Sequence, residues 1–317
     1  MIQVLGDLIA DISMRLPAFP VKARDIHRLS YLEVGPGGAC NVAIMAARFG
    51  LDVGVLGEIG DDSFGLVVRE GLKKEHIDTQ RLVITHGAKT PVAGVVVDRT
   101  SEPAYLGHPG SLQMQSLPAE WKTPIEQATA LFADGWAEHE RIPEITLNAF
   151  HIAREHGVPV FFDPGPGNPD VEGSWVLDAI RQSSVVLLNR SEGRRITALE
   201  DEDQVLDYLQ ELGPDLIILK KGPEGLMLAR GQQRVPLSGI RVDARDATGA
   251  GDSLVGATLF AYLNQFSLEQ IGELANATGA AKVQKLGTGH NMPTMHEVAA
   301  VLNSQGQSPS DFLINEK

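Results

Sequence analysis

The stretch Asp246-Ala-Thr-Gly-Ala-Gly-Asp252 sets small residues and a carboxylate before an expected helix at 253–263. Small residues let the backbone approach a ligand, and a helix start presents unpaired N–H groups and a positive dipole end. Glycines alone would suffice for anion binding. A carboxylate beside a phosphate is electrostatically costly, so we interpret Asp252 as the base that deprotonates an attacking hydroxyl while residues 249–251 hold the phosphoryl group. An aspartate that merely caps the helix is the alternative.

A second glycine-rich stretch, Gly35-Pro-Gly-Gly-Ala-Cys-Asn41, leads into another expected helix. It lacks the Gly-Lys-Ser/Thr ending of a Walker loop and the glycine spacing of a dinucleotide-binding fingerprint. A Gly-Gly turn followed by an amide suits hydroxyl recognition, because Asn offers both donors and an acceptor. An Asn that caps the helix explains the stretch equally well when it is read alone.

The hydrophobic pattern predicts the scaffold that positions these stretches. Short apolar runs without alternation are typical of strands buried on both faces of a parallel sheet. The runs cover residues 4–5, 53–56, 130–133, 158–162, 185–188 and 216–219, and helical patterns cover 41–49, 64–74, 142–156 and 203–212. This order predicts an α/β fold with a doubly wound, mostly parallel sheet flanked by helices, and with ligands at the carboxyl ends of the strands.

Two segments, 11–34 and 89–106, alternate like exposed antiparallel strands. Strands from both segments would form a small β-sheet lid over a main domain made of residues 1–10, 35–88 and 107–303. An apolar lid face must cover a ligand or a second subunit, whereas a pair of surface hairpins is the plainer alternative. The polar residues 304–317 are expected to form a flexible tail.

The composition excludes several classes of function. With 27 basic and 41 acidic residues the formal net charge is −14, which disfavours nucleic acid and anionic lipid as partners. Cys40 is the only cysteine, so an intrachain disulfide and a cysteine metal cluster are excluded. We see no signal peptide and no apolar run long enough to cross a membrane. A cytoplasmic location is therefore expected.

These stretches, taken in order, resemble the signatures of the ribokinase-like (PfkB) carbohydrate kinases. Gly37-Gly38-Ala-Cys-Asn41-Val-Ala, followed by Gly50 and Gly60, is similar to the first signature, and residues 246–252 are similar to the second. The resemblance runs from about residue 2 to residue 302. It implies a ribokinase-like fold with a lid, and ATP- and Mg²⁺-dependent phosphoryl transfer to a hydroxyl. In several members the lid also forms a dimer interface, so a homodimer through the lid is expected.

The resemblance also implies roles for single residues. Asp252 matches the catalytic base, and the anion hole is matched by Gly249, Ala250 and Gly251. The acceptor's hydroxyls would be held by Asp11, Gly37, Gly38 and Asn41. The nucleotide would be bound by Asn189, Gly222, Gly225 and Asn276. Glu192 would order Mg²⁺ through water, and Asp246 with the Thr248 carbonyl resembles part of a monovalent cation (K⁺) site.

Departures from the family's pattern bear on the nucleotide and the acceptor. Lys220 stands where the family often has Thr; it would reach a phosphate of the nucleotide, or it simply lies at an exposed strand end. The Asn189 and Glu192 pair also fits a plain helix cap at a strand end. Ala39 follows the Gly-Gly pair where phosphofructokinase-like members often have Lys.

We therefore expect an unphosphorylated sugar as acceptor, since a phosphorylated one would need cationic side chains. Basic lid residues that would offer charge are more typical of solvated strand edges; they are Lys22, Arg24, Arg28 and Lys89. A nucleoside is the second choice, with an aromatic pocket drawn from Tyr31, Tyr105 and Trp136. A catalytically silent sugar-binding regulator on the same fold is the alternative of another class.

Overall fold

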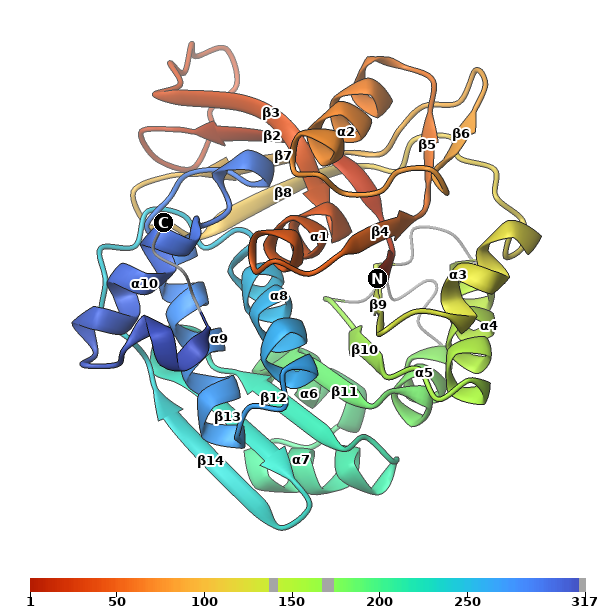
Figure 1. Ribbon diagram of the computed structural model, residues 1–317. Helices are drawn as coiled ribbons and strands as arrows, with labels where there is room; N and C mark the ends of the chain where they lie inside the picture. Colours follow the sequence, from red (N-terminus) through yellow and green to blue (C-terminus); the bar gives the residue numbers. More distant parts are fainter. Residues whose placement is uncertain (137–141, 167–173, 314–317) are drawn as a thin grey trace.

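The computed structural model, which describes residues 1–136, 142–166 and 174–313, is built on a large twisted sheet (Figure 1). Its strand order is β14-β13-β12-β11-β10-β9-β1-β4; from β4 to β12 the neighbours are parallel, and β13 and β14 are antiparallel additions. The bounds are β1 (Ile2–Leu5), β4 (Val53–Leu56), β9 (Leu131–Asp134), β10 (Val160–Asp163), β11 (Val185–Asn189), β12 (Leu216–Lys220), β13 (Gly225–Arg230) and β14 (Gln233–Ser238). The sheet confirms the strands expected from the apolar runs.

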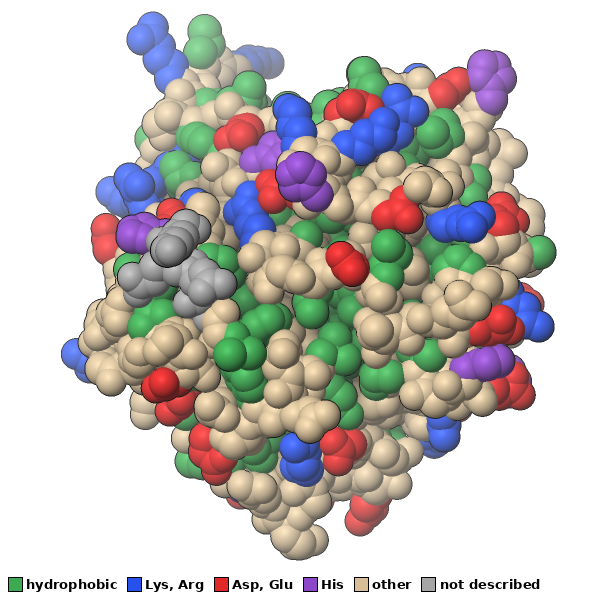
Figure 2. Space-filling model, viewed as in Figure 1, with side chains coloured by type: hydrophobic (Ala, Val, Ile, Leu, Met, Phe, Trp, Pro, Cys, Tyr) green, Lys and Arg blue, Asp and Glu red, His purple; other side chains and the backbone are tan. Residues whose placement is uncertain are grey.

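Helices cover both faces of this sheet, because alternate side chains of each strand point to opposite faces. One apolar core joins α1, α8, α9 and α10 to residues such as Val4 and Phe161, and the other joins α3, α4, α5 and α7 to Leu5 and Phe162. On the face in Figure 2, hydrophobic side chains gather around α1 and α8 and charged ones surround them. The bounds are α1 (Ala39–Arg48), α2 (Ser63–Lys74), α3 (Lys122–Glu126), α4 (Ile142–Glu155), α5 (Trp175–Gln182), α6 (Arg190–Thr197), α7 (Glu202–Glu211), α8 (Ala250–Leu263), α9 (Leu268–Val283) and α10 (Met295–Ser304). This architecture confirms the doubly wound α/β fold.

A separate four-stranded sheet, ordered β3-β2-β7-β8, draws its strands from the two segments that the sequence pattern singled out. The strands are β2 (Leu8–Arg15), β3 (Tyr31–Gly38), β7 (Val92–Val97) and β8 (Pro103–His108), and they extend beyond the predicted lid limits. Asp11, Gly37 and Gly38 therefore lie on this sheet. Its β7–β8 turn touches the main domain, where Ser101 Oγ donates to Ala244 and Ala247 N–H donates to the Ser101 carbonyl. A further two-stranded sheet pairs β5 (Glu58–Gly60) with β6 (Val83–Thr85).

The chain after α10 differs from the predicted flexible tail. A short 3₁₀ helix, Pro309–Phe312, brings Phe312 against Phe266, with ring centroids 6.2 Å apart. Phe312 is only 2% exposed, and burying an aromatic ring outweighs the polar character of the preceding residues. The last four residues of the expected tail, 314–317, lie outside the described residues. Within the described chain, no helix is both long enough and apolar enough to cross a membrane.

Candidate active site

Polar side chains gather at the carboxyl edge of the large sheet. β9, β10, β11 and β12 end at Asp134, Asp163, Asn189 and Lys220, and parallel register sets Asp163 beside Asp134 and Lys220 beside Asn189. Parallel strands bring their carboxyl ends to one edge, so residues far apart in sequence meet there. This edge contains the candidate site.

The catalytic turn predicted at residues 249–252 begins α8. Gly249 precedes the helix with a φ of 72°, a left-handed conformation that favours glycine. Asp252 is the third helical residue, and it does not cap the helix. Among the described residues, no hydrogen-bond acceptor faces the N–H groups of Gly251 and Asp252, while that of Ala250 reaches the Ala247 carbonyl at 3.2 Å. Gly249 to Asp252 are partly exposed, so a ligand has access to the turn.

Asn41 orients the carboxylate of Asp252. Its Nδ2 donates to Asp252 Oδ2 at 2.9 Å, and its Oδ1 accepts from the Gly289 N–H at 2.9 Å. Asn41 is the third residue of α1, after a cap at Gly38, so the alternative interpretation in which it caps the helix is wrong. It is 2% exposed, which fixes its orientation. Asn41 therefore connects the candidate base to the loop that follows α9.

The surroundings of Asp252 raise its pKa to about 6, and burial is the main cause. The hydrogen bond from Asn41 opposes this shift, as do the charges of Lys220 and Lys282, while Asp163 adds to it. A carboxylate with a pKa near 6 is ionised at neutral pH and more basic than a surface aspartate. That is the protonation behaviour a general base needs.

Asp11 extends the acidic surface from the small sheet. It is 4% exposed, and its Oδ2 accepts a hydrogen bond of 2.6 Å from Thr288 Oγ1. Burial raises the pKa of Asp11 to about 7, with the Thr288 hydrogen bond opposing and the charges of Asp252 and Asp246 adding to the rise. A side chain on Gly37 would overlap the Asp11 carboxyl, and one on Gly38 (φ 57°) would overlap a backbone carbonyl. Close packing therefore requires glycine at both positions, whether or not they also contact the acceptor as predicted.

A pocket of about 440 Å³ opens beside the carboxyl ends of β11 and β12. Its lining is rich in cations: it consists of Asn189, Arg190, Ser191, Arg194, Lys220, Lys221 and Gly222. Such a lining suits the phosphates of a nucleotide. Gly225 and Asn276, also predicted to bind nucleotide, are not in this lining. Gly225 makes a close approach to the Leu237 carbonyl, and Asn276 Nδ2 donates to the Ser238 carbonyl at 2.8 Å.

Lys220 lies between this pocket and the turn of α8. Its Nζ donates to Asp163 Oδ2 at 2.5 Å, and a side chain on Gly251 would meet Nζ at 3.4 Å. Burial acts to lower the pKa of Lys220, but the charges of Asp163 and Glu192 outweigh it and the pKa is raised. Lys220 is therefore a cation held next to the predicted anion hole, and it does not lie at an exposed strand end.

Asn189 and Glu192 form a reciprocal helix cap, as the plainer interpretation expected. Glu192 N–H donates to Asn189 Oδ1 at 2.9 Å, and Asn189 N–H and Nδ2 donate to Glu192 Oε2 and Oε1 at 2.6 and 2.7 Å. Both oxygens of Glu192 are thus engaged. Burial raises the pKa of Glu192 to about 6, with Asp163 adding to the shift and Lys220 opposing it.

In the predicted monovalent cation site, the carboxylate of Asp246 binds backbone N–H groups. Asp246 Oδ1 accepts from Thr248 N–H at 2.9 Å, and Oδ2 accepts from Gly287 N–H at 2.8 Å. Thr248 Oγ1 is buried and has no hydrogen-bond partner among the described residues. The side chain of Lys282 is 0% exposed and lies beside this motif, since a side chain on Gly249 would meet Lys282 Cε at 3.5 Å. Sequence reasoning did not select Lys282.

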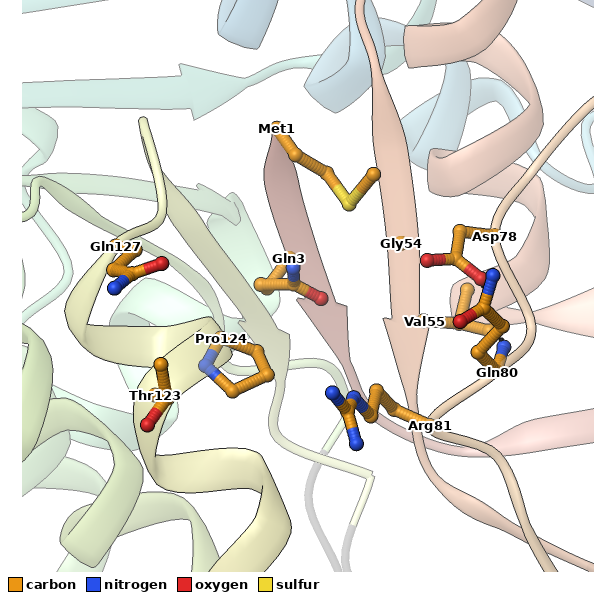
Figure 3. A pocket seen from close by; sticks show the side chains of 10 residues that line it. All are labelled: Met1, Gln3, Gly54, Val55, Asp78, Gln80, Arg81, Thr123, Pro124 and Gln127. Carbon is orange, nitrogen blue, oxygen red and sulfur yellow. Dashed lines mark hydrogen bonds between the residues drawn. The ribbon is translucent and has the colours of Figure 1, made fainter.

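Another pocket, of about 270 Å³, lies at the opposite edge of the sheet (Figure 3). Met1 and Gln3 at the start of β1, Gly54 on β4, and Arg81 are among its lining residues. Parallel strands place this edge at the far end from Asp134 and its neighbours. None of the predicted site residues lines it.

Three residues of the site escaped the sequence analysis: Asp163, Thr288 and Lys282. Asp163 ends an expected strand, and that position at the carboxyl edge could have marked it as a candidate. Lys282 falls four residues after Thr278 in α9, on a face that also carries Ile271 and Ala275, so apolar periodicity predicts burial. Thr288 lies in a loop without a periodic signal.

Two known kinases are similar in sequence to this chain over nearly its whole length. The chain is 28% identical over 311 residues to the ribokinase of Mus musculus, covering 94% of each chain. It is also 28% identical over 308 residues to the ATP-dependent ribose-1-phosphate kinase of Halopiger xanaduensis, covering 96% of this chain and 99% of the relative.

Solved structures agree on the fold. Arabidopsis thaliana ribokinase in complex with ribose and ATP matches with a TM-score of 0.80 at 21% identity, covering 95% of this chain and 98% of the other. A putative ribokinase II from E. coli in complex with ATP and Mg²⁺ matches with a TM-score of 0.83 at 16% identity. The match covers 96% of this chain and 99% of the other. A sequence model described as pfkB family carbohydrate kinase matches residues 1–295. These matches confirm the resemblance, and the chain belongs to the pfkB family of carbohydrate kinases.

Proposed function

We propose that this kinase transfers the γ-phosphate of ATP to a hydroxyl of an unphosphorylated sugar, with Asp252 as general base. The observation that carries the proposal is the carboxylate of Asp252, held by Asn41 within the first turn of α8 and open to a ligand. When bound, ATP supplies the phosphoryl group and Mg²⁺ neutralises part of its charge. Asp252 takes the proton of the acceptor hydroxyl as the new O–P bond forms and the bond to ADP breaks. The N–H groups of residues 249–251 and the Lys220 ammonium stabilise the charge on the transferring group.

The charge of the acceptor side supports an unphosphorylated sugar. Asp11 and Asp252 are carboxylates that accept hydrogen bonds from hydroxyl groups, and their charges would repel a second phosphate. The basic lid residues that were candidates to bind such a phosphate are all exposed; they are Lys22, Arg24, Arg28 and Lys89.

Magnesium fits this site best through water. Both oxygens of Glu192 already accept hydrogen bonds from Asn189, so direct coordination would break the cap of α6. Water-mediated binding suits Mg²⁺, which gives up its hydration shell reluctantly. In this proposal Glu192 orders hydrated Mg²⁺ and the cationic pocket holds the phosphates.

A nucleoside acceptor is the second candidate, and Tyr105 favours it. This half-exposed lid residue lies near the acidic site: the pKa of its hydroxyl is raised by burial and by the charges of Asp252, Asp246 and Asp11. Tyr31 is less suited to stack on a base, because its hydroxyl accepts from Asn291 Nδ2 at 3.0 Å and donates to Glu33. Trp136 packs beside Gly165.

A second copy of the chain is the partner we propose for the lid. Large apolar side chains remain exposed on its strands and loop, with Ile26 93%, Leu32 61% and Leu106 67% exposed. Light scattering of the purified protein tests this: a dimer is expected, and a monomer at micromolar concentration would contradict it.

ADP release over a panel of sugars and nucleosides tests the function. With the preferred acceptor, we expect Asp252→Asn to lower kcat by several orders of magnitude and to change ATP affinity little. Asp203→Asn, an exposed aspartate on α7, is the matched control. A variant that keeps more than about a tenth of the wild-type kcat would contradict the role of Asp252. Sugar binding without turnover, unaffected by Asp252→Asn, would favour the silent regulator.

A further inference from the structure

Lys282 places a positive charge inside the protein, directly behind the catalytic turn. It belongs to the last turn of α9 and is 0% exposed. A side chain on Gly249 would meet Lys282 Cε at 3.5 Å and Thr288 Cγ2 at 3.6 Å. The lysine stem therefore packs against the residue that precedes α8, on the side away from solvent.

The ammonium of Lys282 has few neutral partners. Within the described chain, its one direct hydrogen bond is a long one of 3.4 Å to the Lys285 carbonyl. A buried ammonium is costly unless opposite charge compensates it. That compensation comes from the carboxylates of Asp246 and Asp252, which act to raise the pKa of Lys282 while burial lowers it to about 8. Lys282 is thus still a cation at neutral pH.

The motif around Lys282 offers little to a metal ion. A bound K⁺ needs several oxygen ligands at once. Both oxygens of Asp246 accept backbone N–H groups, and the Val283 carbonyl accepts from the N–H groups of Arg245 and Asp246. The Lys285 carbonyl faces the ammonium, whose charge would repel a second cation. Thr248 Oγ1 is buried without a hydrogen-bond partner among the described residues, but one free hydroxyl is fewer oxygens than K⁺ needs, so the residues present do not fit K⁺.

We propose that the Lys282 ammonium is a built-in cation that replaces a monovalent metal ion behind the anion hole. Its charge balances Asp246 and fixes the turn of residues 246–249 against the loop at 285–289. Lys282 touches no substrate, so it is a positioning residue. The catalytic consequence rests on the proposed kinase function: this kinase works without K⁺ because the cation is covalently attached.

Three variants separate this role from simple packing. Lys282→Ala removes the charge and leaves space for a hydrated ion, whereas Lys282→Met removes the charge and fills most of the space. Lys285→Ala removes a neighbouring charge, which pairs with Glu297 at 2.8 Å, and retains Lys282. Each is assayed in KCl, NaCl or tetramethylammonium chloride at equal ionic strength.

We expect the wild-type kcat to differ by less than about twofold among the three salts. Both Lys282 variants should lose about tenfold or more in kcat. The loss should be smaller than the roughly 10²–10³-fold effect of removing a donor that contacts the reacting group, because Lys282 touches no substrate. Only Lys282→Ala should recover activity in KCl, and Lys285→Ala should respond to salt as the wild type does. Wild-type kcat more than threefold higher in KCl than in tetramethylammonium chloride would overturn the proposal. Equal behaviour of Lys282→Ala in the three salts would overturn it as well.

The melting temperature gives a readout that does not depend on activity. KCl should raise the melting temperature of Lys282→Ala above its value in tetramethylammonium chloride and leave that of the wild type unchanged, because an ion that binds only the native state stabilises it. A K⁺-specific rise in the wild type would refute the built-in cation even if no acceptor is ever phosphorylated. Failure of the kinase function alone would leave these melting temperatures as predicted.

Discussion

Removing the Asn41 side chain should shift the pH dependence of the reaction. Asn41→Ala deletes the 2.9 Å hydrogen bond to Asp252 Oδ2. A hydrogen bond to a charged group is worth about 1.5–3 kcal/mol, and one pKa unit corresponds to about 1.36 kcal/mol. The hydrogen bond favours the ionised form, so its loss raises the pKa. We therefore expect the pKa of Asp252 to move from about 6 to roughly 7–8.

The assay is the pH dependence of kcat/KM between about pH 5 and 9, followed by ADP release, since this ratio reports groups on the free enzyme. A base is active when ionised, so activity rises with pH through its pKa. The wild-type acidic limb should lie near pH 6. With a pKa of about 7.5, Asn41→Ala would be about eightfold less ionised than the wild type at pH 6.5, and the two would converge near pH 9.

A control distinguishes this shift from general damage to α8. Asn264→Ala removes a 2.9 Å hydrogen bond to the Phe260 carbonyl at the other end of the same helix, and it should leave the acidic limb in place. Asn41 also accepts from the Gly289 N–H, so a pH-independent loss is expected on top of the shift. An acidic limb that stays near pH 6 in a folded Asn41→Ala protein would refute the role of Asn41.

Two further predictions concern the phosphate pocket and the end of the chain. Lys220→Met should raise the KM for ATP and lower kcat at least about tenfold. Lys221→Met, which removes an ion pair to Glu202, should have a smaller effect. Equal effects of the two variants would contradict the role of Lys220 in binding the phosphate. Phe312→Ala should lower the free energy of unfolding by about 3 kcal/mol, as buried aromatic truncations do. Urea denaturation measures it, and a loss below about 0.5 kcal/mol would show that residue 312 does not stabilise the core.

Most of the fold follows from periodicity in the sequence. Unbroken apolar runs such as Val185 to Leu188 must be buried on both faces, which only helices on either side of a parallel sheet provide. Once the order of strands and helices is known, the carboxyl edge is the expected site. The first turn of α8 was predictable because its glycines indicate a tight turn before a helix and its aspartate indicates a candidate base.

The remaining contacts depend on tertiary structure, which periodicity does not encode. Thr288 meets Asp11 across 277 residues of sequence, and the Asn41 amide finds Asp252 across 211. Apolar periodicity predicts that Lys282 faces the core, but its position behind the first turn of α8 depends on how α8 and the loop after α9 pack over it. The segment before residue 314 has the same limit: a polar composition predicts solvation, yet the ring of Phe312 is buried against the core.

Burial decides what the two lysines beside the anion hole can do. Lys220 lines the open pocket, so its ammonium can turn from Asp163 to an incoming phosphate and contribute to ATP binding as well as to transfer. Lys282 has no exposed surface and holds a fixed charge behind the same turn. A charge that never contacts the nucleotide can change the geometry of the turn without changing ATP affinity. Loss of Lys220 should therefore affect both KM and kcat, whereas loss of Lys282 should affect kcat alone.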